Sequence, residues 1–130
     1  MAAVDFPGIA KQFVEHYYTT FDTDRKNLAT LYRENSMLTF ESVQQLGVNN
    51  ITEKLVSLPF QKVKHQFAEP DAQPSPSGGI IILVTGQLVR RDFQVDDESR
   101  PLPYSQVFQL CQDANGAWFV FNDVFKLVLG

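Results

Sequence analysis

The hydrophobic periodicity of the chain changes once, close to Pro59, and this change limits the folds open to it. Before Pro59, apolar residues recur every three or four positions, which is typical of amphipathic helices. After Lys62, apolar and polar residues alternate, which is typical of half-buried strands. Helices followed by strands predict an α+β domain, in which the helices pack on an antiparallel sheet.

Three helices are predicted in the first half of the chain. The first follows Asp5, a candidate N-cap, and tolerates Pro7 because the first turn loses no internal hydrogen bond there. A short second helix follows Asp24. The third follows Asn50, a second candidate N-cap, and stops at Pro59. The apolar face of the first helix consists of Phe6, Ile9, Ala10, Phe13, Val14, Tyr17 and Phe21.

The strands are predicted from alternation and from β-branched runs. A short strand at 37–40 is followed by "ESVQQLG", a turn or a second short strand. Residues 62–67 place His65 on the apolar side with Val63 and Phe67. "PDAQPSPSGG" is typical of a turn, and Gly86 in "IIILVTGQLV" is a candidate bulge or bend. With "YSQVFQLC" and "AWFVFNDVFKLVL", these strands predict a long, bent sheet that closes with the helices into a cone with a pocket.

Composition narrows the classes of function. The 130 residues fit a single domain spanning 1–130, and 44% of them are hydrophobic, which indicates a folded core. The net charge of −4 gives no electrostatic case for nucleic acid, and no apolar run is long enough to span a bilayer. Cys111 is the only cysteine, which favours a reducing compartment, the cytosol or the nucleus. No phosphate loop, metal spacing or cofactor motif is present, so no cofactor and no metal are expected.

His65 is the residue whose role the sequence leaves most open. A buried imidazole needs a hydrogen-bond partner, so His65 is a structural residue, the wall of a docking pocket, or a catalytic base. Glu41 follows an apolar strand, and an acid–base pair with His65 would require both side chains to face the cone mouth. Asn122 and Asp123 interrupt the last strand and are interpreted as structural.

The last strand also indicates whether the chain associates with a second copy of itself. Apolar residues occupy both of its faces in "WFVFNDVFKLVL", which is more than one core requires. A second copy of the chain packed on the outer face would account for the excess. The sequence therefore predicts a homodimer.

Several long words of the sequence occur in the same order in one known family. "FVEHYYTTFDTDR", "LYRENSMLTFE", "EKLVSLPFQKVKH", "DAQPSPSG", "TGQL" and "FNDVFKL" resemble the nuclear transport factor two family, from about Phe6 to Leu127. The resemblance implies a homodimeric cone of the cystatin-like fold without catalytic activity. It also implies a carrier that binds the GDP form of the small GTPase Ran and the Phe-x-Phe-Gly repeats of nucleoporins. The expected locations are the cytoplasm, the nucleus and the nuclear pore complex.

The resemblance also implies which residues form the binding sites. A Ran aromatic side chain would enter the cone, with Glu41 and Lys62 as charged residues on its rim. The walls of the Ran site would be Phe40, Leu58, Phe60, His65, Leu83 and Val124. In the family, an aromatic residue at the start of the first helix binds nucleoporin repeats, and here that residue is Phe6.

A charged hairpin departs from the family pattern. "VRRDFQVDDESRPLP" is longer than the family's acidic hairpin. Asp92 matches the family's acid when counted from "GQL", and Asp97 matches when counted back from "YSQVF"; Asp97 is preferred because a hairpin tip accommodates extra residues. Arg90 and Arg91 are unusual beside a site for a basic partner.

Two other functions remain open at this point. One is an isomerase- or dehydratase-type enzyme that works inside the cone with His65 and Glu41, because the wider fold superfamily includes such enzymes. The other is a scaffold module that binds Phe-Gly peptides but not Ran.

Overall fold

The computed structural model describes residues 5–58, 62–90 and 101–128. The helical elements are α1 (Phe6–Thr23), the 3-10 helix η1 (Arg25–Leu31), α2 (Val48–Val56) and the short 3-10 helix η2 (Pro76–Gly78). The strands are β1 (Tyr32–Phe40), β2 (Val43–Leu46), β3 (Val63–Phe67), β4 (Asp71–Ser75), β5 (Gly79–Arg90), β6 (Leu102–Gln112) and β7 (Trp118–Leu127). The α+β prediction is confirmed, and the second predicted helix takes the 3-10 form. The segment predicted as a turn at 70–79 contains β4 instead.

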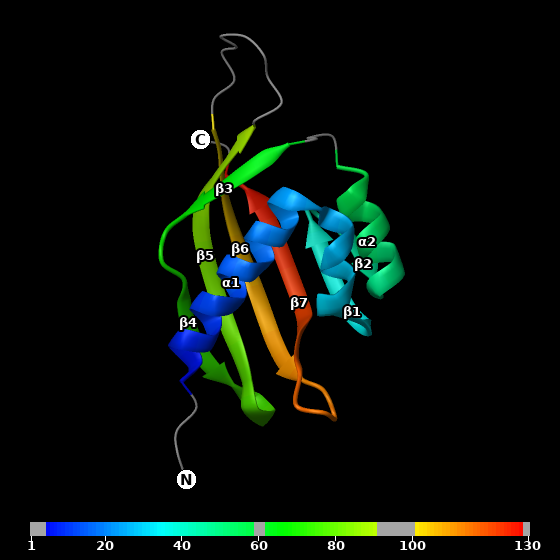
Figure 1. The fold of residues 1–130 in the computed structure, drawn as a ribbon, viewed down its shortest axis with the longest axis vertical. Helices are drawn as coiled ribbons and strands as arrows, with labels where there is room; N and C mark the ends of the chain where they lie inside the picture. Colours follow the sequence, from blue (N-terminus) through cyan, green and yellow to red (C-terminus); the bar gives the residue numbers. More distant parts are fainter. Residues whose placement is uncertain (1–4, 59–61, 91–100, 129–130) are drawn as a thin grey trace.

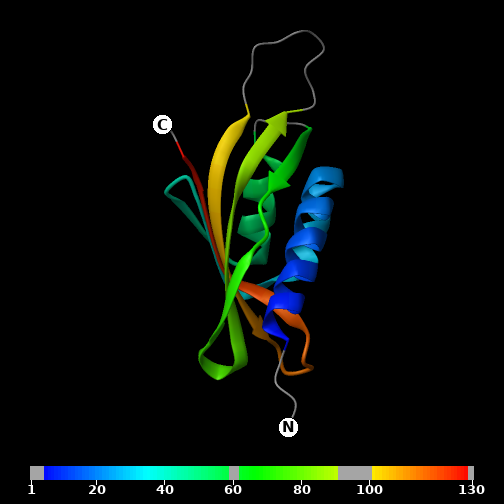
Figure 2. The same cartoon turned by 90° about the vertical axis from the view of Figure 1, so that its left-hand side faces the viewer.

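The strands form one sheet in the order β2-β1-β7-β6-β5-β3, with β4 paired to the first half of β5. The prediction of a wholly antiparallel sheet is wrong for one pair, because β1 and β7 run parallel. A parallel pair requires a long crossover, and α2 with the β3–β6 meander supplies it. Figures 1 and 2 show α1 lying across one face of the curled sheet, while the other face carries no helix among the described residues.

The start of each main helix is determined locally. The side chain of Asp5 accepts a hydrogen bond of 3.0 Å from the Gly8 N–H and caps α1, as predicted. The prediction for α2 is wrong, because the N-cap position is Gly47, whose φ of 89° favours glycine. Asn50 lies inside the helix and donates to the Leu46 carbonyl instead.

Alternation along the central strands divides the sheet into a buried face and an outer face. Ile80, Ile82 and Val84 of β5 are buried, whereas Ile81 and Leu83 are exposed. The buried face packs against α1, and burying each large aliphatic side chain contributes about 1.5–3 kcal/mol.

Gly86 marks a close approach between strands. The register with β6 is continuous through Gly86, but on the other side of β5 the pairing with β3 ends at Gly86 and resumes with β4 at Leu83, one residue out of step. The irregularity expected here, a bulge or a bend, therefore lies in the partner strands rather than between β5 and β6. A Cβ atom there would collide with the Gln66 carbonyl oxygen of β3, which explains the glycine. Further register shifts lie elsewhere in the sheet, between β6 and β7 at Gln109 and Leu110 and between β1 and β7 from Tyr32 to Met37.

Candidate functional site

His65 lies on the buried face of β3, as its alternation predicted, and 2% of its side chain is exposed. Its Nδ1 atom lies 2.7 Å from Oδ1 of Asp22, and its backbone N–H donates to Oδ2 of the same carboxylate at 2.9 Å. Asp22 belongs to the last turn of α1. The two contacts therefore join the end of α1 to β3 and fix the plane of the imidazole ring.

The histidine ring is part of a continuous series of aromatic contacts, which we call the aromatic row: Tyr18, His65, Tyr104, Phe125 and Phe40. His65 stacks on Tyr18 at 4.0 Å between centroids and meets the Tyr104 ring edge-on at 5.6 Å. Tyr104 stacks on Phe125 at 5.2 Å, and Phe125 stacks on Phe40 at 4.5 Å. The row thus connects His65 and Phe40, two predicted pocket residues from distant parts of the sequence.

The hydroxyl group of Tyr104 is buried in this row. Among the described residues it has no hydrogen-bond partner, and the residue is 1% exposed. Leaving a buried polar group unpaired costs about 1–3 kcal/mol.

Glu41 occupies the tight turn between β1 and β2, beside the end of β7. Glu41 and Ser42 both have left-handed backbone conformations, with φ of 51° and 74°. The Glu41 N–H donates to the Phe125 carbonyl at 3.1 Å, and its carboxylate accepts a short hydrogen bond from the Leu127 N–H. The backbone of β7 therefore holds the carboxylate next to the Phe40 end of the aromatic row.

The acid–base pair considered for an enzyme is not formed. The carboxylate that contacts His65 is Asp22, whereas Glu41 contacts the backbone of β7. In the part of the chain that the structure describes, no group of three or more histidine, cysteine, aspartate or glutamate side chains could hold a metal ion.

The other predicted residues of the docking site have different positions. Leu58 is buried after α2, and Lys62 is exposed just before β3. Phe6 begins α1 and is half-buried against the core. Phe60, Asp92, Asp97 and Arg91 lie outside the described residues.

Leu83 and Val124 do not lie with the predicted pocket residues. Both are 45% exposed and belong to the outer face of the sheet, away from His65. Their placement as pocket walls needs correction, because strand alternation turns Val84 and Phe125 to the buried face instead. Leu83 pairs across the sheet with Val107, and Val107 pairs with Val124, so the three form an apolar row on the outer face.

A buried polar network lies beneath α1, around Asp123. The carboxylate accepts from Tyr32 at 2.7 Å, from Tyr17 at 3.2 Å and from the Gln106 amide at 2.7 Å. Tyr18 donates to the other end of Gln106, at 2.7 Å. Burial raises the pKa of Asp123 to about 6, although its hydrogen bonds with Gln106, Tyr32 and Tyr17 lower it. The structural interpretation of Asp123 fits this position, and Asn122 is exposed.

Sequence reasoning missed three residues of this region: Asp22, Tyr104 and Phe125. Phe125 could have been found from Asp123, because residues two apart on a strand share a face. Tyr104 opens the predicted strand "YSQVFQLC" and shares a parity with the buried Gln106 and Phe108. Asp22 had no signal, since it is one of two aspartates in "FDTDR" and its contact with His65 spans 43 positions.

The fold and this site define a class of protein: a cone-shaped α+β domain with an aromatic interior and a charged turn at the end of its sheet. The Nuclear transport factor 2 (NTF2) domain matches residues 9–127, and the chain belongs to this family.

Close relatives share nearly the whole chain. The nuclear transport factor 2 of Neurospora crassa is 71% identical over 127 residues, covering 98% of both chains. That of Davidiella tassiana is 58% identical over 125 residues, covering 95% of both. The structure of nuclear transport factor 2 from Cryptosporidium parvum has a TM-score of 0.84 and 46% identity, covering 95% of this chain and 94% of that one.

These similarities determine the general role. The chain is a nuclear transport factor, a carrier and not an enzyme, and it takes part in transport between nucleus and cytoplasm. None of the helices in residues 5–58, 62–90 and 101–128 is long and apolar enough to cross a membrane.

Proposed function

We propose that this chain carries the GDP form of Ran from the cytoplasm through the nuclear pore into the nucleus. The observation that carries the proposal is the convergence of Phe40, Glu41 and His65 at one end of the sheet, through the aromatic row. A Ran aromatic side chain would pack against this aromatic wall, and a Ran cation would meet Glu41. An aromatic anchor surrounded by charged pairs gives a small interface both affinity and specificity.

The remaining residues of the proposed Ran site are Leu58, Phe60, Lys62 and Asp97. Leu58 and Phe60 would extend the apolar wall, whereas Lys62 and Asp97 would add charges to the rim. Leu83 and Val124 are left out of this site because they lie on the outer face of the sheet.

The experiment that tests the proposal is a pull-down of Ran, loaded separately with GDP and with GTP, at moderate salt. We expect binding of the GDP form and no binding of the GTP form. No binding of either form would contradict the proposal. If Phe-x-Phe-Gly peptides still bound in that case, the scaffold function would take its place.

Passage through the pore would use Phe6. Its ring begins α1 and packs only partly against the core, so part of it is available to the phenylalanines of nucleoporin repeats. Apolar contact of this kind suits weak, rapidly exchanging binding.

We also propose that the chain is a homodimer joined through the outer face of its sheet. The apolar row of Leu83, Val107 and Val124 lies on this face, next to Ile81, which is 41% exposed. A depression of about 280 Å³ on this face is lined by Ile81, Leu83, Val107, Asp71 and Gln73. A second copy packed on this face would bury the apolar side chains that the single chain leaves in water.

Introducing a charge into this face should separate the subunits. We expect Val124→Glu to give the mass of a monomer in sedimentation velocity at concentrations where the unaltered chain is a dimer, because the carboxylate would be buried at the interface without a partner. The matched control is Val56→Glu, which places the same charge on an exposed position of α2. A monomeric mass for the unaltered chain at all concentrations would refute the dimer.

A further inference from the structure

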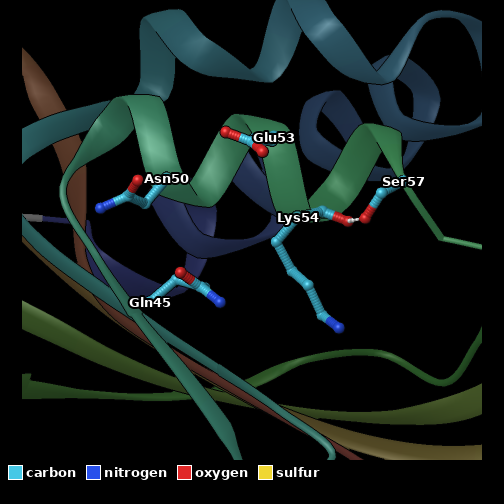
Figure 3. Close-up of a pocket in the computed structure, with 5 residues that line it drawn as sticks. All are labelled: Gln45, Asn50, Glu53, Lys54 and Ser57. Carbon is cyan, nitrogen blue, oxygen red and sulfur yellow. Dashed lines mark hydrogen bonds between the residues drawn. The ribbon is translucent and has the colours of Figure 1, made fainter.

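A polar groove separates α2 from β2, the edge strand of the sheet. It holds about 210 Å³ and is lined by Gln45, Asn50, Glu53, Lys54 and Ser57. Figure 3 shows Lys54 reaching down from the helix and Gln45 reaching from the strand into the same space. We call this space the Lys54 groove.

The Lys54 ammonium group has no carboxylate within ion-pair distance in the described part of the chain. Glu53 is its neighbour in sequence, but its carboxylate points away from the ammonium group (Figure 3). Within residues 5–58, 62–90 and 101–128, the ammonium group interacts only with the Phe40 ring, 5.9 Å from its centroid. This distance is at the limit of a cation–π contact, so the charge remains available to a stronger partner.

The hydrogen-bonding groups of the groove favour an anionic acceptor. Asn50 uses a donor on the Leu46 carbonyl, and Ser57 donates its hydroxyl to the Lys54 carbonyl. The remaining side-chain donors are the second N–H of Asn50, the Lys54 ammonium and the Gln45 carboxamide, and among the described residues the last two make no hydrogen bond. An ammonium and an amide on opposite walls match a carboxylate, which has two oxygens and no donor.

The groove adjoins the proposed docking site through Phe40. One face of the Phe40 ring is stacked on Phe125, and Lys54 approaches the same ring from α2. Glu41 is the next residue of the chain. A partner whose aromatic side chain reached Phe40 would therefore come close to both a negative group at Glu41 and a positive group at Lys54.

We propose that the Lys54 groove receives an aspartate or glutamate side chain of the docked protein partner, with Lys54 as its cation and Gln45 as an additional donor. This inference rests on the proposed docking function, since it places the acid on the same partner that meets Glu41. Two opposite charges at separate positions near Phe40 would accept the partner in one orientation and repel it in the reverse one.

The test measures the affinity of the full chain for GDP-loaded Ran by titration, with variants that separate charge from packing. Lys54→Met keeps an apolar stem over Phe40 without the charge, and we expect roughly three- to fivefold weaker binding with a smaller salt dependence. Lys54→Glu should weaken binding by about tenfold or more, because the new carboxylate would face the carboxylate of the partner. Lys54→Arg should keep most of the affinity, because the positive charge remains.

Lys11→Glu is the matched control, because it makes the same charge change at an exposed position of α1, and it should bind within about twofold of the unaltered chain. Binding by Lys54→Glu equal to that of Lys11→Glu would overturn the inference. So would equal losses in Lys54→Met and Lys54→Arg, because they would indicate a packing role. If the unaltered chain bound no Ran, the docking function itself would fail, which is a separate outcome.

Discussion

The Asp123→Asn variant is expected to gain stability relative to the unaltered chain as the pH rises. Burial raises the pKa of Asp123 from about 3.8 to about 6 in the folded state. Between these values the folded chain holds one more proton than the unfolded chain, so its stability falls as the pH rises, and it levels off above pH 6. A difference of about two pH units corresponds to about 3 kcal/mol. The variant lacks this dependence, so the difference between the two should change by about that amount over the whole window, and by about 2 kcal/mol between pH 4.5 and pH 7.5.

The geometry of the network provides the physical reason. Tyr17, Tyr32 and Asp123 form a triangle with hydroxyl-to-hydroxyl and hydroxyl-to-carboxylate distances of 2.6, 2.7 and 3.2 Å. The two hydroxyl groups have only two protons for these three contacts when Asp123 is ionised. A proton on the carboxyl group would occupy the third contact and remove a buried charge. Among the charged and titratable groups that face Asp123, the described residues include no cation: Tyr17, Tyr18 and Tyr32 are neutral phenols, and Gln106 is an amide.

The measurement is urea unfolding of both proteins at several values between pH 4.5 and 7.5, at one protein concentration, because dimerisation would add to the apparent stability. Asp113→Asn is an informative control. The Ala117 N–H and Arg33 hold the pKa of Asp113 below its usual value of 3.8, so Asp113 is ionised in both the folded and the unfolded chain across this range, and the difference in stability between this variant and the unaltered chain should stay nearly constant. A constant difference between Asp123→Asn and the unaltered chain across this range would show that Asp123 does not titrate in it.

Local sequence patterns were sufficient to predict the helices and strands whose conformation is determined by residues within the element itself. The helical spacing of apolar residues predicted α1, and alternation predicted that His65 faces the core of β3. The parallel pair of β1 and β7 could not be predicted in this way, because it joins strands from opposite ends of the chain. Tyr32 illustrates the same limit: it begins β1 and donates to Asp123, a contact that spans 91 positions of the sequence.

Residues of the candidate site were predictable where they belong to a family motif. They were not predictable where the face of a strand on which a residue lies determines whether it belongs to the site. Glu41 and His65 were both predicted from sequence segments that resemble the family, and in the structure the aromatic row links His65 to Phe40, the neighbour of Glu41. Val124 was placed in the pocket although Phe125 lies there, because β7 has apolar residues on both faces and sequence alone does not identify the inner one. Asp22 was missed because a contact between a helix end and a distant strand leaves no local pattern.

The Glu41→Lys variant is expected to lose Ran binding while the dimer persists. The substitution would place an ammonium group where a cation of the partner is proposed to bind, and like charges at an interface cost several kcal/mol. The variant would also lose the acceptor for the Leu127 N–H. Glu41→Gln separates the two effects, because its amide oxygen can still accept from Leu127 while the charge is gone. We expect roughly tenfold weaker binding for Glu41→Gln and loss of at least about a hundredfold for Glu41→Lys.

Glu34→Lys is the matched control for this variant, since it makes the same change at an exposed position nearer the other end of β1. It should bind GDP-loaded Ran as the unaltered chain does, because a charge at that end lies away from Phe40 and the turn. Sedimentation of each variant would separate a lost docking contact from a lost dimer, because Glu41 is not part of the apolar row on the outer face. Undiminished binding by Glu41→Lys would show that Glu41 is not part of the docking site. A selective loss would mean that the carboxylate at this turn contacts the partner.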